Sequence, residues 1–192
     1  MARKSNVKVK DRETYNGRLT KQLKGVIPKF DEFFKKEKFK SIIEIGTGNG
    51  IFSTYIAKNA KEMEASFITY DIRAVAKDIK KELDELGCIV IRDDMNNHRK
   101  EIIAMIKKPE RCLLLIDGAD KTEPVEFFLN FLKKDDILLS HDYYKQDGDY
   151  LSKLFYIHTR HIDLNVFNNI DVIYRDLFSD YLWLCMKKEL ND

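Results

Sequence analysis

The chain has 192 residues, of which 44% are hydrophobic and 34% charged, and its formal net charge is +2. This length suits one domain that buries roughly 70% of its unfolded surface, and the composition is ordinary for a soluble globular protein. The small net charge does not favour a nucleic-acid or membrane partner. No apolar run reaches the ~18 residues that span a bilayer and no signal-peptide pattern follows Met1, so we expect a cytoplasmic protein.

The first segments of the chain are a basic stretch and an amphipathic one. The cationic residues of the basic stretch are Arg3, Lys4, Lys8, Lys10 and Arg12. We interpret residues 1–17 as a solvated basic tail and residues 18–192 as a single domain. Residues 18–38 repeat apolar side chains at helical spacing, which predicts a helix that Pro28 kinks or splits.

The most informative pattern is a buried strand that runs into a glycine-rich turn. The strand is expected at 41–45, because this run is short, apolar and bounded by turn residues. The turn that follows is rich in glycine, which lets the backbone bend sharply and lets a ligand approach closely. A helix is expected at 50–60, and its first turn would point free N–H groups at a carboxylate or phosphate.

Strands and helices then alternate along the chain. We expect strands at 67–71, 88–91, 112–116 and 137–140, and helices at 74–86, 97–107 and 123–133. Repeated βα units with short connections predict a parallel sheet with helices on both faces. Residues 149–159 are expected to be helical. Residues 170–174 and 181–186 should form an antiparallel hairpin that ends the sheet, with a link too short for a helix.

The spacing of the glycines distinguishes between two nucleotide-type ligands. A dinucleotide fold prefers G-x-G-x-x-G, in which the third glycine packs the helix against the strand. Here the pattern is G-x-G-x-G followed by Ile51, which argues against NAD. The segment Glu44-x-Gly46-x-Gly48-x-Gly50 instead resembles the first motif of the class I S-adenosylmethionine-dependent methyltransferases. The alternative is a glycine-rich turn that binds no ligand.

This resemblance implies a Rossmann-like α/β fold with a seven-stranded, mostly parallel sheet that contains one antiparallel strand. It also implies that the turn binds the amino-acid end of the cofactor and that Glu44 faces the cofactor's ammonium group. Asp71 ends a strand, where a carboxylate can accept the ribose hydroxyls or cap a helix. Ile72 is expected to pack on the adenine. The expected cofactor contacts are Glu44, Gly46, Thr47, Gly48, Asn49, Gly50, Asp71, Ile72, Asp94, Met95 and Asp117.

Ionisable residues follow two further strands, at Asp117 to Lys121 and at His141 to Asp142. Open α/β sheets bind ligands at these carboxyl ends, and two carboxylates side by side there need a cation or a proton between them. Oxygen ligands of this kind suit Mg²⁺. His141 is the best single candidate for a base, because the ordinary pKa of histidine is about 6.5. A structural histidine that hydrogen-bonds the loop is the alternative.

The two segments together resemble small-molecule O-methyltransferases of the cephalosporin-hydroxylase-like and macrocin type, and more distantly the catechol and caffeoyl-CoA enzymes. In those enzymes two strand-end aspartates bind a divalent metal that holds a substrate diol, and Asp117 and Asp142 match them. Tyr143 stands where the catechol type has an asparagine ligand, so the site has only two protein carboxylates or no metal. Lys121 matches the base lysine of the caffeoyl-CoA type, with one residue more in the spacing, or is a solvated lysine.

We therefore expect a single methyltransferase domain that uses S-adenosylmethionine to methylate a small-molecule hydroxyl, with Mg²⁺ as an optional assistant. The expected catalytic residues are His141, Lys121 and Asp117, since a metal lowers the hydroxyl pKa and a nearby base takes the proton. The aromatic segment 143–150 should form a pocket wall or pack in the core. The alternatives are a nucleic-acid or protein methyltransferase on this fold and a non-catalytic binder, which Tyr143 favours. The N/D/S-P-P-Y/F motif of amino-methylating DNA enzymes is absent.

Overall fold

The computed structural model describes residues 11–119, 121–146, 149–152, 160–162 and 169–189, together with Leu164 and Phe167. A seven-stranded sheet with the order β11-β12-β7-β6-β3-β4-β5 forms its centre. The strands are β3 (Ser41–Ile45), β4 (Ser66–Tyr70), β5 (Cys88–Ile91), β6 (Cys112–Ile116), β7 (Ile137–His141), β11 (Ile170–Val172) and β12 (Trp183–Lys188). Neighbours from β5 through β7 are parallel, whereas β12 runs antiparallel to both β7 and β11. The predicted mostly parallel sheet with one antiparallel strand is confirmed.

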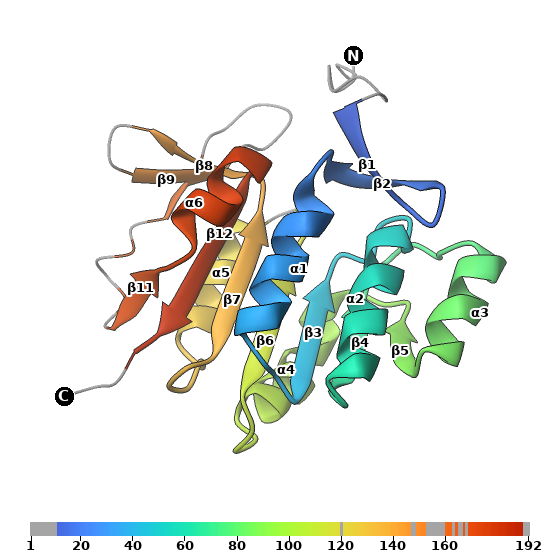
Figure 1. Ribbon diagram of the computed structural model, residues 1–192. Coiled ribbons are helices and arrows are strands. Elements are labelled where there is room, and N and C mark those ends of the chain that lie inside the picture. The colour runs from blue at the N-terminus through green and yellow to red at the C-terminus, as the bar shows by residue number, and fades with distance from the viewer. Residues whose placement is uncertain are drawn as a thin grey trace, which may run out of the picture.

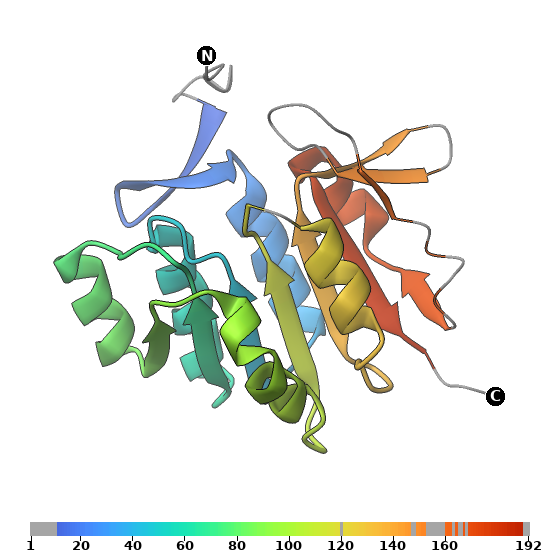
Figure 2. The same ribbon diagram turned by 180° about the vertical axis from the view of Figure 1, so that it is seen from behind.

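Helices cover both faces of this sheet, as predicted. One face carries α1 (Val26–Lys36), α2 (Ile51–Glu62), α3 (Lys77–Glu85) and α6 (Arg175–Phe178) (Figure 1). The opposite face carries α4 (Arg99–Ile106) and α5 (Thr122–Leu129) (Figure 2). Single turns of 3-10 helix, η2 (Met95–His98) and η4 (Ser179–Tyr181), precede α4 and follow α6.

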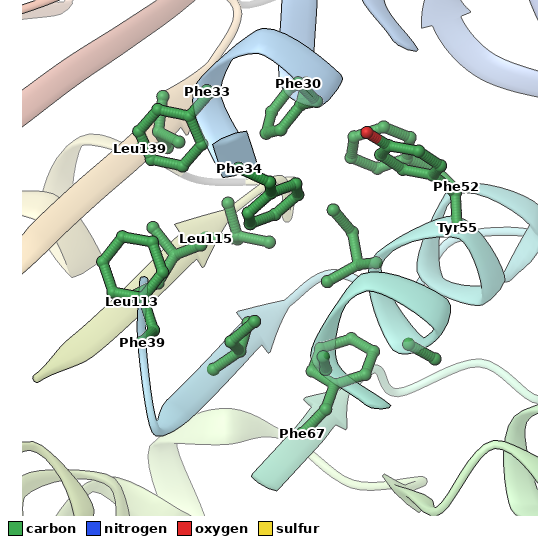
Figure 3. Close-up of a cluster of buried hydrophobic side chains, with 14 of the residues drawn as sticks. Phe30, Phe33, Phe34, Phe39, Phe52, Tyr55, Phe67, Leu113, Leu115 and Leu139 are labelled. Carbon is green, nitrogen blue, oxygen red and sulfur yellow. The ribbon is translucent and has the colours of Figure 1, made fainter. Parts of the chain in front are cut away.

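Two hydrophobic clusters, one on each face, hold these layers together. Figure 3 shows part of the cluster beneath α1 and α2, where aromatic side chains of both helices pack over leucines of the sheet. Phe30 of α1 is fully buried, and its ring lies 5.2 Å from that of Phe52 in α2. Since burying such a side chain contributes about 1.5–3 kcal/mol, this cluster fixes α2 firmly on the sheet. The glycine turn that leads into α2 is fixed with it.

The N-terminal region differs from the prediction. A hairpin of β1 (Arg12–Tyr15) and β2 (Arg18–Leu23) replaces the end of the predicted basic tail and the first part of the helix predicted over 18–38. Its two-residue turn is formed by Asn16 and Gly17, with φ of 50° and 73°. In β2 it is the polar Thr20 and Gln22 that are buried, whereas Leu19 is 41% exposed. The spacing of the leucines therefore does not mark the face of a helix.

The helix of this region begins only at Val26. Pro28 consequently lies in its first turn, where the missing N–H breaks no helical hydrogen bond, and the predicted kink or split is absent from α1. Glu13 of β1 serves this helix start, because its carboxylate accepts hydrogen bonds from the N–H groups of Gly25 at 2.6 Å and Ile27 at 3.4 Å.

The C-terminal third shows two further differences. Residues 149–152 form β9 (Asp149–Ser152) rather than the start of a helix over 149–159, and residues 153–159 lie outside the described residues. β9 pairs with β8 (Tyr143–Gln146) and β10 (Arg160–Ile162) in a separate sheet, so strand pairing overrides the local helical pattern. The link between β11 and β12 holds α6 and η4, although it was predicted to be too short for a helix.

The hairpins β1–β2 and β8–β9 lie at the edge where the parallel strands end (Figure 1). They stand on either side of the carboxyl ends of β3, β6 and β7, which is where ligands bind in open α/β sheets. Among the residues that the structure describes, no helix is long and apolar enough to cross a membrane.

Candidate active site

The turn between β3 and α2 depends on glycines in the left-handed region. Gly46, Gly48 and Gly50 have φ of 105°, 63° and 80°. A Cβ on Gly46 would lie 2.5 Å from backbone atoms of Asp117 and Gly118, at the end of β6. A Cβ on Gly50 would lie 2.6 Å from Cγ2 of Ile79 in α3. The sequence therefore uses glycine here because the chain must approach its neighbours too closely for any side chain.

Glu44 lies beneath this turn and stabilises it through hydrogen bonds. Its carboxylate accepts hydrogen bonds of 2.6 Å from the hydroxyls of Ser53 and Thr69. The Thr69 hydroxyl is in turn 2.6 Å from that of Thr47, which belongs to the glycine turn. Glu44 is only 2% exposed and is not among the residues that line the pocket between the turn and β4. Its contact with a cofactor ammonium group stays a prediction.

Replacing Glu44 with glutamine should change how stability depends on pH. Burial raises the pKa of Glu44 to about 7, against the opposing effect of the two hydroxyl donors. Because the native state then holds a proton that the unfolded chain releases above about pH 4.3, wild-type stability falls as the pH rises from there to about 7. Glu44→Gln removes this loss, so between about pH 5 and pH 8 it should gain about 2–3 kcal/mol relative to wild type.

Urea unfolding at both pH values measures this difference. The matched control is Glu62→Gln, which makes the same substitution at an exposed position of α2. Parallel profiles for Glu44→Gln and wild type would contradict a buried carboxylate with a raised pKa.

An open pocket of about 650 Å³ lies at the carboxyl ends of β3, β4, β5 and β6. Its walls come from the glycine turn, from the loops after these strands and from the start of α5. The lining residues are Ile45, Gly46, Tyr70, Asp71, Ile72, Arg73, Asp93, Asp94, Met95, Asn96, Arg99, Gly118, Ala119, Glu123 and Pro124. Five of the predicted cofactor contacts are thus brought together, namely Gly46, Asp71, Ile72, Asp94 and Met95.

Asp71 joins the glycine turn to the wall of the pocket. Its Oδ2 accepts the Gly48 N–H at 2.8 Å, and its Oδ1 accepts the Arg73 N–H at 2.8 Å. The neighbouring Ile72 is 67% exposed and offers an apolar surface at the pocket. Asp94 caps η2 by accepting the Asn96 N–H at 2.9 Å, so this predicted contact also has a structural task.

Four charged side chains meet beside the pocket, at the carboxyl ends of β6 and β7. His141 Nδ1 lies 2.9 Å from Asp117 Oδ1 and 3.4 Å from Asp142 Oδ1. Lys121 Nζ lies 2.6 Å from Asp142 Oδ2 and 3.8 Å from Asp117 Oδ1. Lys121, His141 and Asp142 are each less than a tenth exposed. The expectation that these residues share one edge of the sheet agrees with the structure, and we call them the charged cluster.

The two carboxylates govern the ionisation of His141. Burial alone would lower the pKa of His141, but Asp117 and Asp142 outweigh it and raise this pKa above its ordinary value. Burial would likewise raise the pKa of Asp117, but His141, Lys121 and Gln22 keep it below its ordinary value. Because the Asp117 carboxylate accepts the hydrogen bond from Nδ1, Nε2 is the ring nitrogen that a base would use, and it is buried without a hydrogen-bond partner among the described residues. Both predicted roles of His141, a base and a histidine that hydrogen-bonds the loop, stay predictions.

The charged cluster does not fit a divalent metal as it is arranged. By spacing alone a metal could be held, because one ligand atom each of Asp117, His141 and Asp142 lie within 4.8 Å of one another. However, the ammonium group of Lys121 already contacts both carboxylates. These are the two carboxylates to which the resemblance assigns the metal.

The N-terminal hairpin contributes residues to the site that the sequence did not reveal. Gln22 Nε2 donates to Asp117 Oδ2 at 2.6 Å, and Gln22 Oε1 accepts from Trp183 Nε1 at 3.2 Å. Asn49, predicted to bind the cofactor, donates to the carbonyl of Leu19 in β2 at 2.9 Å. No local signal places residue 22 beside residue 117, since the contact arises only when the hairpin packs on the sheet.

The aromatic segment after β7 is only partly described. Tyr143 is 1% exposed and belongs to the hydrophobic cluster beneath α4 and α5, so it packs in the core rather than in a pocket wall. Of the predicted segment 143–150, residues 147 and 148 lie outside the described residues.

Solved structures share this fold. The "CmcI-N160 apo-structure" aligns with 100% of this chain and 82% of its own, with a TM-score of 0.67 and 11% identity. The structure "cmcI-N160 SAH" aligns with 98% of this chain and 88% of its own, with a TM-score of 0.59 and 10% identity. The structure "cmcI-D160 Mg-SAM" aligns with 74% of this chain and 62% of its own, with a TM-score of 0.53 and 10% identity.

At these identities the likeness establishes the fold alone, and the predicted Rossmann-like α/β fold is confirmed. No protein-family model matches the chain, and none of the curated proteins compared with it matches either.

Proposed function

We propose that the protein is an S-adenosylmethionine-dependent O-methyltransferase that acts on a small-molecule hydroxyl. The observation that carries this proposal is the pocket bounded by the glycine turn, Asp71 and the loop after β5. Its support is the fold, which is shared with structures whose names include S-adenosylmethionine (SAM) and S-adenosylhomocysteine (SAH). The pocket volume of about 650 Å³ lies within the roughly 300–1,000 Å³ usual for sites of this kind.

In this proposal the amino-acid end of the cofactor lies against the glycine turn, and its ribose hydroxyls donate to Asp71. A carboxylate offers about four acceptor positions. On Asp71 the backbone N–H groups of Gly48 and Arg73 occupy two, and the exposed Arg73 side chain donates to a third from Nε at 3.4 Å. One position is open to the ribose, and a second opens when the Arg73 side chain turns away. The adenine would lie between Ile72 and Met95, with Asp94 at its edge. Thr47, Gly48, Asn49 and Gly50 would shape the turn rather than contact the adenosine.

The reaction would form a bond between the acceptor oxygen and the methyl carbon and break the carbon–sulfur bond of the sulfonium. The cofactor leaves as a neutral thioether, and the acceptor hydroxyl loses its proton. Asp117 is the member of the charged cluster next to the pocket residue Gly118, and we assign it the task of orienting that hydroxyl. His141 can take the proton only above its raised pKa, when the imidazole is neutral. Lys121 holds the neighbouring Asp142 in place.

The site favours a small acceptor over a large one, because the charged cluster is largely buried and Gln22 of β2 covers Asp117. We also propose a cytoplasmic location for the protein, as predicted. Cys88, Cys112 and Cys185 are buried free thiols, as expected of a chain kept in a reducing compartment.

Calorimetric titration with SAM, SAH and NAD tests the proposed function. Both sulfur compounds should bind one to one in the micromolar range, and NAD should give no saturable heat, because the glycine spacing does not suit a dinucleotide. Silence with SAM and SAH, or a preference for NAD, would refute the proposal. Transfer of labelled methyl groups to a panel of hydroxyl compounds, with RNA and protein as alternatives, would then identify the acceptor class.

A further inference from the structure

In the charged cluster, side chains of the protein itself compensate the negative charges of two adjacent carboxylates. Lys121 Nζ contacts both Asp142 and Asp117, and His141 Nδ1 contacts the same two side chains from β7. Two carboxylates so close would repel each other without a positive charge between them. The ammonium group of Lys121 supplies this charge.

Lys121 is held in this position by its surroundings. It immediately precedes α5 and is 4% exposed, although a lysine normally extends into solvent. Its partner Asp142 has a left-handed backbone with a φ of 66°. A non-glycine residue keeps this strained conformation only where the surrounding contacts hold it there. We take this as a sign that the fold positions Asp142 for the ion pair.

We propose that Lys121 stands in place of the divalent metal of the catechol-type enzymes, so that this site binds no metal. A divalent ion on Asp117 and Asp142 would lie within a few ångströms of the Lys121 ammonium group, and the two cations would repel strongly in a buried site. A consequence rests on the proposed function: without a metal to chelate, the acceptor needs one hydroxyl rather than a vicinal diol.

Titration with Mn²⁺, followed by electron paramagnetic resonance and calorimetry, tests the inference on the full chain. Wild-type protein should show no saturable Mn²⁺ binding at micromolar concentrations. Lys121→Met keeps an unbranched side chain, one atom shorter, and removes its charge, so it should bind one Mn²⁺ at least about tenfold more tightly than wild type. Lys121→Arg keeps the cation and should behave like wild type. Adding Asp142→Asn to Lys121→Met should remove the gain.

One Mn²⁺ bound tightly by wild type, or a folded Lys121→Met without any gain, would overturn the inference. Circular dichroism establishes whether Lys121→Met folds; if it does not, Lys121→Gln takes its place and the wild-type titration alone still decides whether a metal binds. SAM binding is measured separately on each protein. A wild type that binds neither SAM nor Mn²⁺ would refute the proposed function and leave the absence of a metal standing, so the two failures are distinguishable.

Discussion

Replacing Gly46 with alanine should destabilise the protein by about 2–6 kcal/mol and abolish cofactor binding. At a φ of 105° an alanine is strained, which costs of order 1–3 kcal/mol. Its Cβ would also lie 2.5 Å from the backbone of Asp117 and Gly118. A backbone at the end of a buried central strand cannot move aside as a flexible side chain can, so the overlap adds to the strain. Urea unfolding and SAM calorimetry on the same protein measure both effects.

Gly87 provides the control for this substitution. It has a similarly left-handed φ of 81°, but a Cβ there would meet nothing within 4 Å. Gly87→Ala should therefore lower the stability only by the backbone strain, about 1–2 kcal/mol, and leave SAM binding unchanged. Equal losses of stability in the two variants would show that the close approach of the turn to β6 is not what requires glycine at position 46.

The central sheet could be predicted from the sequence because the burial of its strands is visible in their residue pattern. Every residue of β3 and β6 is buried, so each strand reads as a short apolar run bounded by turn residues. The intervening helices are long enough to show their own period. The alternation of the two then leaves few arrangements other than a parallel sheet with helices on both faces.

The N-terminal hairpin was missed because its burial pattern is inverted. Leu19 is exposed while Thr20 and Gln22 are buried, so the apolar residues suggest a helix and the alternation of a strand is hidden among polar ones. One signal was present in the sequence: the dipeptide Asn16-Gly17 is typical of two-residue hairpin turns, and both residues do have positive φ. Weighing that dipeptide above the leucine spacing would have favoured the hairpin.

The candidate site could be predicted only as far as the backbone dictates it. Strand ends brought Asp117, His141 and Asp142 to one edge, as the sequence indicates. Which cation compensates the two carboxylates depends on the side chain of Lys121, whose role the sequence left open between a base and a solvated lysine. The structure gives it a third role, because a side chain at a helix start can turn inward as readily as outward, and only packing decides.

Replacing Asp71 with alanine should weaken SAM binding by about 100-fold or more. Hydrogen bonds to a charged group contribute about 1.5–3 kcal/mol each, and the variant would lose those that the ribose hydroxyls donate to this carboxylate. It would also release the Gly48 N–H from its 2.8 Å bond and loosen the glycine turn. Asp71→Asn keeps one acceptor oxygen and should lose only about tenfold. Asp78→Asn, an exposed change at the start of α3, serves as the control.

A cofactor fragment separates the two tasks of Asp71. 5′-Methylthioadenosine contains the ribose and the adenine but lacks the amino-acid end that would lie on the glycine turn. If Asp71 binds the ribose directly, Asp71→Ala should weaken the fragment as well as SAM in calorimetry, and SAM by the larger factor because the glycine turn is also loosened. If only SAM loses affinity, the carboxylate acts by holding Gly48, and the ribose assignment is wrong. Unchanged affinity for both ligands would place the cofactor elsewhere, because a buried carboxylate at the pocket wall cannot be removed without consequence for a ligand that fills that pocket.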